Sequence, residues 1–250
     1  MRPKRCRGWI WRVGALALAA LTLTGCAGAR GGGPAVPSPG FARPAADAHD
    51  SWWVYRFRIA WPPEEKADFA VDLMLAHAVV KPSLDIFAER FAYWRFHRRA
   101  VRDAAGHRFT ILFYTDPQTA REFYASLEAS LVLKELREQG LVTQIIRDDP
   151  NAPVRPGIAD TSDSSWSPML QRHWPPYIMG VSLMWLGPVD DAVGALPPEQ
   201  RANSDRLAVY RAAEKRVLAL WFKEGQHAFF HHLSAVFGYR ELLIVKPMRF

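Results

Sequence analysis

The stretch Ser51-Trp52-Trp53-Val54-Tyr55-Arg56-Phe57-Arg58-Ile59 decides the fold, because large apolar side chains alternate along it with polar or smaller ones. Every second position is filled by one of four apolar residues, Trp53, Tyr55, Phe57 and Ile59. Successive side chains of a strand point to opposite faces of a sheet. The stretch therefore predicts a strand with one aromatic face, which Trp61-Pro62-Pro63 ends.

Further elements follow this strand as far as residue 148. The pattern predicts a helix at 64–79, a break at Lys81-Pro82-Ser83, a short helix at 84–91, strands at 93–102 and 108–115 joined by a hairpin loop, a helix from Asp116-Pro117 to Gly140, and a strand at 141–146. The order β-α-β-β-α-β is that of a ferredoxin-like α+β sandwich. We therefore expect residues 51–148 to form an α+β part of this class.

The remainder is expected to be a connecting loop at 149–166 and a mainly helical part at 167–250 that packs on the same body. The apolar run 177–186 ends at Gly187-Pro188, is too short to cross a membrane, and is expected to be a buried core helix. Helices are also predicted at 205–224 and 226–237, the second as an aromatic core helix with histidines on its polar side. Residues 242–245 are expected to return to the sheet as a final strand.

The positive charge of the chain is concentrated near its start. The 250 residues carry 32 basic and 25 acidic side chains, a formal charge of +7, and five of the basic ones form an acid-free cluster, namely Arg2, Lys4, Arg5, Arg7 and Arg12. The apolar run Val13–Leu23 follows; a spanning helix needs ~20 apolar residues, so this run suits a secretory signal instead. Leu23-Thr24-Gly25-Cys26 then resembles the lipobox of bacterial lipoproteins.

This resemblance covers residues 1–26 and implies a signal peptide at 1–25 that is cleaved before Cys26. It also implies diacylglycerol on the Cys26 thiol and an acyl chain such as palmitate on the new amine, a lipid load that anchors a protein stably. Ala27 stands where lipoproteins retained in the inner membrane tend to carry Asp, so the resemblance implies the outer membrane, on its periplasmic side. Residues 26–50, rich in Gly, Pro and Ala, are expected to be a lipidated tether with an r.m.s. span of roughly 25–30 Å.

Removal of the signal peptide changes what the composition implies. Without its five basic residues, 27 basic side chains remain against 25 acidic ones, a net charge of +2, and Cys26 is the one cysteine left. We therefore expect no nucleic-acid partner, no intrachain disulfide and no thiolate catalyst.

Two short motifs have some residues of catalytic sites but lack others. His227 and His231 have the i, i+4 spacing of zincin ligands, but Ala228 stands where the general-base Glu is required. Gly180-Val181-Ser182-Leu183-Met184 begins like a nucleophile elbow, but Met184 replaces the second glycine. The sequence thus predicts no enzyme and no cofactor, with His227 and His231 as weak candidates for a metal site.

Basic residues are also frequent on the predicted strands, where Arg56, Arg58, Arg95 and Arg99 are candidates for anion binding. Arg95, His97 and Arg99 fall on one face of their strand, and Trp94 and Phe96 fall on the other. An open face of this kind would suit lipid head groups, lipopolysaccharide phosphates or an acidic protein. Alternatively, the face is solvated or covered by helices, with its arginines paired to acids of the C-terminal part.

Three functional hypotheses follow. The first is a non-enzymatic, membrane-anchored lipoprotein that binds or supports cell-envelope components, its partner being an envelope protein or an anionic lipid head group. The second is a binding module for an anionic or amphipathic small molecule. The third is a metal-dependent periplasmic hydrolase that uses His227 and His231.

Overall fold

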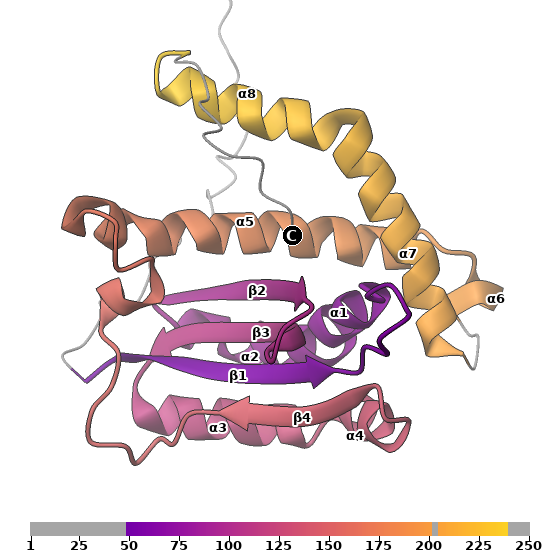
Figure 1. Ribbon diagram of the computed structural model, residues 1–250, viewed down its shortest axis with the longest axis horizontal. Helices are drawn as coiled ribbons and strands as arrows, with labels where there is room; N and C mark the ends of the chain where they lie inside the picture. The colour runs from indigo at the N-terminus through magenta and orange to yellow at the C-terminus, as the bar shows by residue number, and fades with distance from the viewer. Residues whose placement is uncertain (1–48, 202–204, 240–250) are drawn as a thin grey trace, which may run out of the picture. The chain divides into compact units, whose positions relative to one another are not determined.

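The computed structural model describes residues 49–201 and 205–239, so the predicted signal peptide, most of the tether and the predicted strand at 242–245 lie outside the described residues. All described elements belong to one compact unit, Ala42–Phe250. The fold is mixed α+β, with a four-stranded antiparallel sheet and helices (Figure 1).

The strands are β1 (Ser51–Ile59), β2 (Tyr93–Val101), β3 (Gly106–Thr115) and β4 (Val142–Arg147). Their order in the sheet is β2-β3-β1-β4, and each neighbouring pair is antiparallel. Each strand lies within two residues of its predicted range. One difference matters for the site, because the predicted hairpin loop included His107, whereas the turn ends at Gly106 (φ +64°) and His107 is a buried residue of β3.

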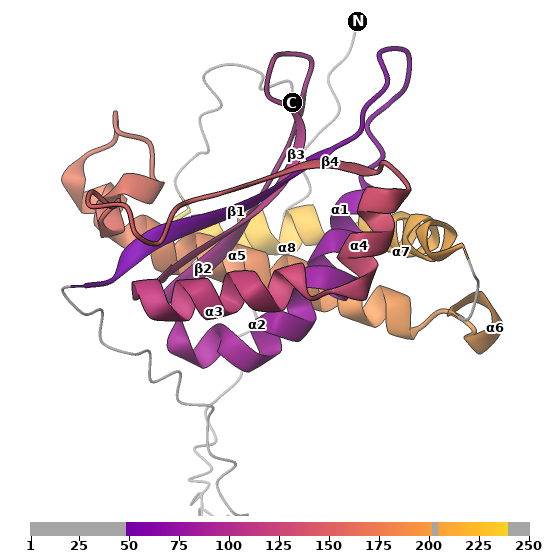
Figure 2. The ribbon, with the colours of Figure 1, turned by 90° about the horizontal axis from the view of Figure 1, so that it is seen from below.

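One face of the sheet is covered by helical segments, as Figure 2 shows. These are α1 (Ala70–Met74), the π-helical turn η1 (Leu75–Val80), α2 (Lys81–Phe87), the 3₁₀ turn η2 (Ala88–Arg90), α3 (Pro117–Glu128) and α4 (Leu131–Glu138). The alternating aromatic residues of β1 are buried here with Phe109 and Phe113 of β3 and Phe123 of α3. The core predicted from the period-two pattern therefore lies between this sheet face and the helices.

The first helical segment differs from its prediction at both ends. It begins at Ala70 rather than residue 64, because the Arg102 guanidinium donates to the carbonyls of Trp61, Pro62 and Glu65 and holds that segment as a loop. The expected break at Pro82 is absent, since proline is tolerated in the first turn of a helix and α2 begins at Lys81. The π-helical turn η1 joins α1 to α2 without a loop.

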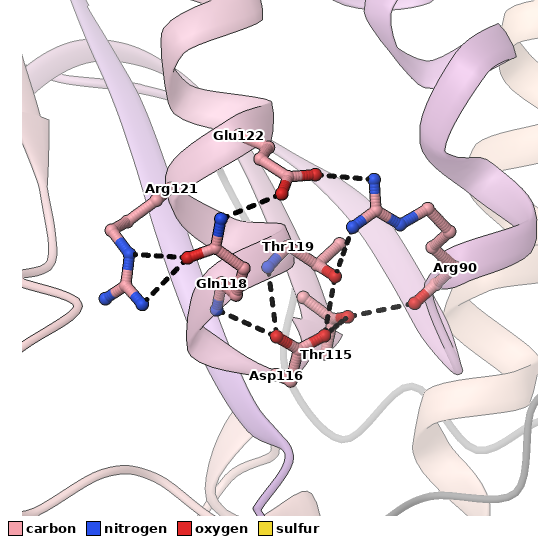
Figure 3. Close-up of polar contacts among 7 residues, drawn as sticks. All are labelled: Arg90, Thr115, Asp116, Gln118, Thr119, Arg121 and Glu122. Carbon is pink, nitrogen blue, oxygen red and sulfur yellow. Dashed lines mark hydrogen bonds and ion pairs between the residues drawn. The ribbon is translucent and has the colours of Figure 1, made fainter.

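The helix predicted from Asp116 to Gly140 is instead two helices. Asp116 caps α3 as predicted, accepting hydrogen bonds from the backbone N–H groups of Gln118 and Thr119, and Arg90 bonds Thr119 and forms an ion pair with Glu122 (Figure 3). Ser130 starts α4 because its hydroxyl accepts from the Leu133 N–H, at 3.3 Å. The sequence pattern did not indicate the cap at Ser130, because apolar residues lie on both sides of it.

A long helix, α5 (Pro168–Gly194), lies along the edge strand β2 (Figure 1). It contains Pro175 and Pro176 and continues past Gly187-Pro188, where the helix predicted at 177–186 was expected to end. Its buried residues recur every three or four positions and include Pro175, Met179, Ser182, Leu186 and Val189, so packing along one side outweighs the lost backbone bonds. Ser182 accepts a hydrogen bond from the Phe96 N–H at 3.0 Å, which satisfies part of the free edge of β2.

The remaining elements are the 3₁₀ turn η3 (Ile158–Thr161), α6 (Pro198–Arg201), α7 (Arg206–Leu220), the π-helical turn η4 (Trp221–Gly225) and α8 (Gln226–Val236). Helix α7 packs on α1 and α5, with Val209, Tyr210 and Ala213 buried. The prediction that residues 226–237 form a core helix is wrong, because α8 has no buried residue. None of the described helices is long and apolar enough to span a membrane.

Candidate functional site

The sheet face opposite α1–α4 carries the four arginines predicted from the sequence as anion-binding residues, Arg56, Arg58, Arg95 and Arg99. The strand registers form two rows on this face: Arg58, Arg108 and Arg99 in one, and Arg56, Thr110 and His97 in the next. Arg95 belongs to a third row, beside Leu112. We call Arg56, Arg58, Arg95, His97, Arg99 and Arg108 together the cationic face.

Two nearby basic residues, Arg98 of β2 and Arg102 of the hairpin turn, do not belong to the cationic face. Arg98 has the opposite parity on β2, so it faces the helices, where it contacts Asp72 at 3.3 Å and stacks over Phe69 and Trp185. Arg102 lies in the hairpin turn, with its guanidinium 3.5 Å from the centre of the Trp61 ring. Strand alternation thus separates the basic residues into those of the cationic face and those with structural roles.

Several residues of the cationic face are fixed by local bonds. Arg95 donates to the Thr161 hydroxyl and carbonyl, at 3.0 and 3.1 Å, which ties β2 to η3. Arg99 forms an ion pair with Asp103, and Arg58 and Arg108 donate to carbonyls of the same hairpin turn. These contacts limit the rotamers of the guanidinium groups.

Arg56 is different, because its guanidinium has no hydrogen-bond or ion-pair partner within residues 49–201 and 205–239. Asp148 feels the charge of Arg56, but one of its carboxylate oxygens accepts from the Val54 N–H at 2.9 Å. The pKa of Asp148 is raised, mainly by burial and against the opposing effects of the Val54 N–H and Arg56. Arg56 therefore keeps donors that a bound anion can use.

Burial, together with mutual repulsion among the cations, lowers the pKa of three residues of the cationic face. The pKa of His97 is lowered, first by loss of hydration and then by Arg95, Arg56 and Arg99. The pKa of Arg108 is lowered by burial and by the neighbouring arginines, and burial lowers the pKa of Arg95 to about 10. An anion on this face would relieve that repulsion, which is a source of binding free energy.

One end of the cationic face continues into a pocket of about 530 Å³. Its lining combines Arg58 with the turn residues Trp61, Arg102 and Asp103 and with the buried ring of His107. The other end is closed by η3, since Trp52 donates to the Ile158 carbonyl at 3.1 Å and packs beside Tyr114. The accessible part of the face therefore runs from Arg95 to the Arg58 pocket.

The other sequence candidates have less support. The rings of His227 and His231 stack with centroids 5.3 Å apart, and the described part of the chain holds no group of three or more His, Cys, Asp or Glu side chains suited to a metal ion. The Ser182 hydroxyl is used within the fold, donating to the Ile178 carbonyl and accepting from Phe96. Cys26 lies outside the described residues.

Sequence reasoning missed a buried polar cluster on the helix side of the sheet. Asp72 of α1 is fully buried and accepts from His107 Nε2 at 2.7 Å and from Arg98. The other ring nitrogen of His107, Nδ1, is buried without a hydrogen-bond partner among the described groups. A single acid inside the apolar run Ala70-Val71-Asp72-Leu73 was the available signal for this cluster.

Comparison with known proteins adds little to these observations. No protein-family model and no curated protein matches the chain. A solved structure described as the crystal structure of TsrL is similar over 75% of this chain and 55% of that protein, with 13% sequence identity and a TM-score of 0.32. The match therefore spans about half the length of that protein, and at this TM-score it carries no argument about fold or function.

Proposed function

We propose that this chain is a bacterial lipoprotein, anchored through Cys26 in the outer membrane and facing the periplasm, whose cationic face binds a phosphate-bearing component of the cell envelope. The carrying observation is the gathering of five arginines and His97 on one sheet face, with the Arg56 guanidinium unpaired among the described residues. The role is that of a non-enzymatic binding protein, and the ligand is an anionic lipid head group or a phosphorylated glycolipid.

We also infer a ferredoxin-like topology for residues 51–147. Two β-α-β units support it: β1 and β2 flank β3, and β3 and β4 flank β1, with helices between the members of each unit. In this arrangement one face of the sheet is covered by helices and the other is left free. The topology thus accounts for the placement of the candidate site on the helix-free face.

The binding proposal is tested with the paired substitution Arg56→Gln/Arg58→Gln in the chain from residue 26, carrying Cys26→Ser. Titration calorimetry with pyrophosphate, and flotation with vesicles that contain phosphatidylglycerol, measure the affinity. Because a hydrogen bond to a charged group contributes about 1.5–3 kcal/mol, we expect at least a tenfold loss of affinity. The salt dependence of binding should also become shallower.

The matched control is Arg121→Gln/Arg172→Gln, which removes the same charge from exposed sites on α3 and α5. Equal losses in both pairs would show a nonspecific charge effect and contradict a defined site. The anchor is tested separately in the full chain with Cys26→Ser, which should release the protein from the outer-membrane fraction. Retention in that fraction would contradict the lipid-anchor proposal.

A further inference from the structure

The C-terminal helical arm, η4 with α8, exposes a continuous apolar stripe. Phe229, Phe230, Leu233, Val236 and Phe237 recur at spacings of three and four residues and so share one side of the helix. The side chain of Phe222 in η4 precedes this stripe and is 71% exposed, as is that of Phe237. We call Phe222, Phe229, Phe230, Leu233, Val236 and Phe237 the phenylalanine stripe.

No described element outside the arm packs extensively on the phenylalanine stripe. Helix α8 buries no residue and packs extensively on η4 alone. In Figure 1, α8 lies on the far side of α5 from the sheet. An isolated helix of this length is marginal in water, and a contiguous set of exposed apolar side chains marks an interaction surface.

The π-helical turn η4 accommodates the aromatic side chains of the arm. Gly225 is buried beneath the Trp221 ring, and a Cβ at that position would lie 3.1 Å from Trp221 Cε3. The ring of Trp221 stacks on Phe229, with centroids 6.1 Å apart, and meets Phe230 edge-on. The π-helical turn η4 therefore sets Trp221 at the border of the stripe.

The polar side of α8 indicates what covers the stripe. Residues 225–237 contain no Asp, Glu, Lys or Arg, and the two charged residues of the arm, Lys223 and Glu224, both lie in η4. His227 and His231 lie on the side of α8 opposite the stripe. An uncharged helix with phenylalanines on one side and a bordering tryptophan resembles a helix that lies in the interface of a bilayer, where tryptophan is enriched.

We propose that the arm docks on the surface of the membrane that anchors the chain, with the phenylalanine stripe inserted below the head groups. This inference rests on the proposed lipoprotein function, because the tether holds the domain near a bilayer. With an r.m.s. span of roughly 25–30 Å, a tether of this kind gives an effective concentration in the millimolar range, so a weak contact suffices. Docking would orient the domain on the bilayer surface.

The test uses the chain from residue 26 with Cys26→Ser, which retains every described element and has no cysteine of its own. Phe237→Cys is labelled with an environment-sensitive fluorophore and mixed with vesicles of phosphatidylcholine and phosphatidylglycerol. We expect a blue shift and quenching by lipid-borne quenchers. The matched control, Lys134→Cys on the exposed side of α4, should report water throughout.

Two paired substitutions in the labelled chain separate this proposal from the cationic face. Phe222→Ser/Phe230→Ser should weaken vesicle partition roughly tenfold or more for each phenylalanine, because burying one contributes about 1.5–3 kcal/mol. Arg56→Gln/Arg58→Gln should leave the blue shift of a vesicle-bound label in place. If the arginine pair abolishes the shift and the phenylalanine pair does not, the cationic face carries the contact and the arm proposal is wrong.

Three other results would also overturn docking on the bilayer. A label that stays in water with vesicles present excludes insertion. A label that is already in an apolar environment without vesicles shows another occupant: a second copy if light scattering gives a dimer, or another part of the same chain if it gives a monomer. None of these results bears on the Cys26 anchor, which the fractionation experiment tests independently.

Discussion

Tyr55 and Tyr124 allow the contribution of a buried hydroxyl to the free energy of unfolding to be compared between an unpaired and a hydrogen-bonded case. Their rings are 5.5 Å apart in the same core. Tyr55 is 0% exposed, and its hydroxyl has no hydrogen-bond partner within the described structure. The Tyr124 hydroxyl instead donates to the Val54 carbonyl at 3.0 Å. Burial raises the pKa of both phenols, so both hydroxyls remain protonated donors at neutral pH.

Tyr55→Phe and Tyr124→Phe are therefore expected to have opposite effects on the free energy of unfolding. Removing an unsatisfied buried hydroxyl relieves a desolvation penalty of about 1–3 kcal/mol, so Tyr55→Phe should stabilise the fold by about 1 kcal/mol after allowance for the small void. Tyr124→Phe removes a hydrogen bond worth about 0.5–1.5 kcal/mol. We expect the low end, because the Val54 carbonyl also accepts from the Asp148 N–H, at 3.4 Å.

Urea unfolding at neutral pH measures both variants, with the slope of the transition as a check that the unfolded state is unchanged. In a thermal scan, each kcal/mol should move the midpoint by about 2–4 °C for a domain of this size. A loss of 1 kcal/mol or more in Tyr55→Phe would mean that its hydroxyl has a partner. Effects of the same sign in both variants would refute the reasoning from the hydrogen-bond pattern.

Two further predictions concern ionisable groups. His107→Ala should lower the free energy of unfolding, measured in urea, by about 3–5 kcal/mol, because it leaves the buried Asp72 carboxylate short of a partner. The double variant Asp72→Leu/His107→Phe should lose less, since Arg98 can then turn to solvent. A double variant at least as unstable as the single one would argue against this reasoning. Because the pKa of His97 is lowered in the fold, the unfolded chain takes up a proton at higher pH than the folded one. The free energy of unfolding should therefore fall as pH drops through the ordinary histidine pKa of about 6.5. Urea unfolding at several pH values should show a smaller fall in His97→Gln, and an unchanged fall would exclude His97 as its source.

The sequence predicted those parts of the fold that depend on local periodicity. The period-two pattern of residues 51–59 located β1 and its buried face, and the Asp116-Pro117 pair located the start of α3. The same alternation assigned Arg95 and Arg99 to the face opposite Trp94. These features were accessible because each depends on residues within a few positions of one another.

What the sequence could not reveal depends on packing between distant segments. Proline normally ends a helix, yet α5 continues through Pro175 and Pro188 because its buried side packs along β2 and α7. Asp72 and His107 are 35 positions apart, and only the pairing of α1 with the sheet brings them together. The phenylalanines of residues 226–237 indicated a core helix, because apolar periodicity alone does not distinguish a covered stripe from one awaiting a partner.

The proposed lipidated tether would change how both candidate surfaces should be judged. The cationic face is broad and borders an open pocket, and the phenylalanine stripe is a convex helix surface, so neither encloses a ligand as a deep cavity does. For a free protein such surfaces would bind weakly. For a domain held within roughly 25–30 Å of a bilayer, the effective concentration of lipid is of millimolar order or higher, and contacts with millimolar dissociation constants are substantially occupied. Under the two proposals, the lipid anchor would supply proximity, the arm would supply orientation, and the arginines of the cationic face would supply selectivity for phosphate. Affinities measured on the chain without its lipid should accordingly be modest, and the informative quantity is the ratio between each variant and its matched control.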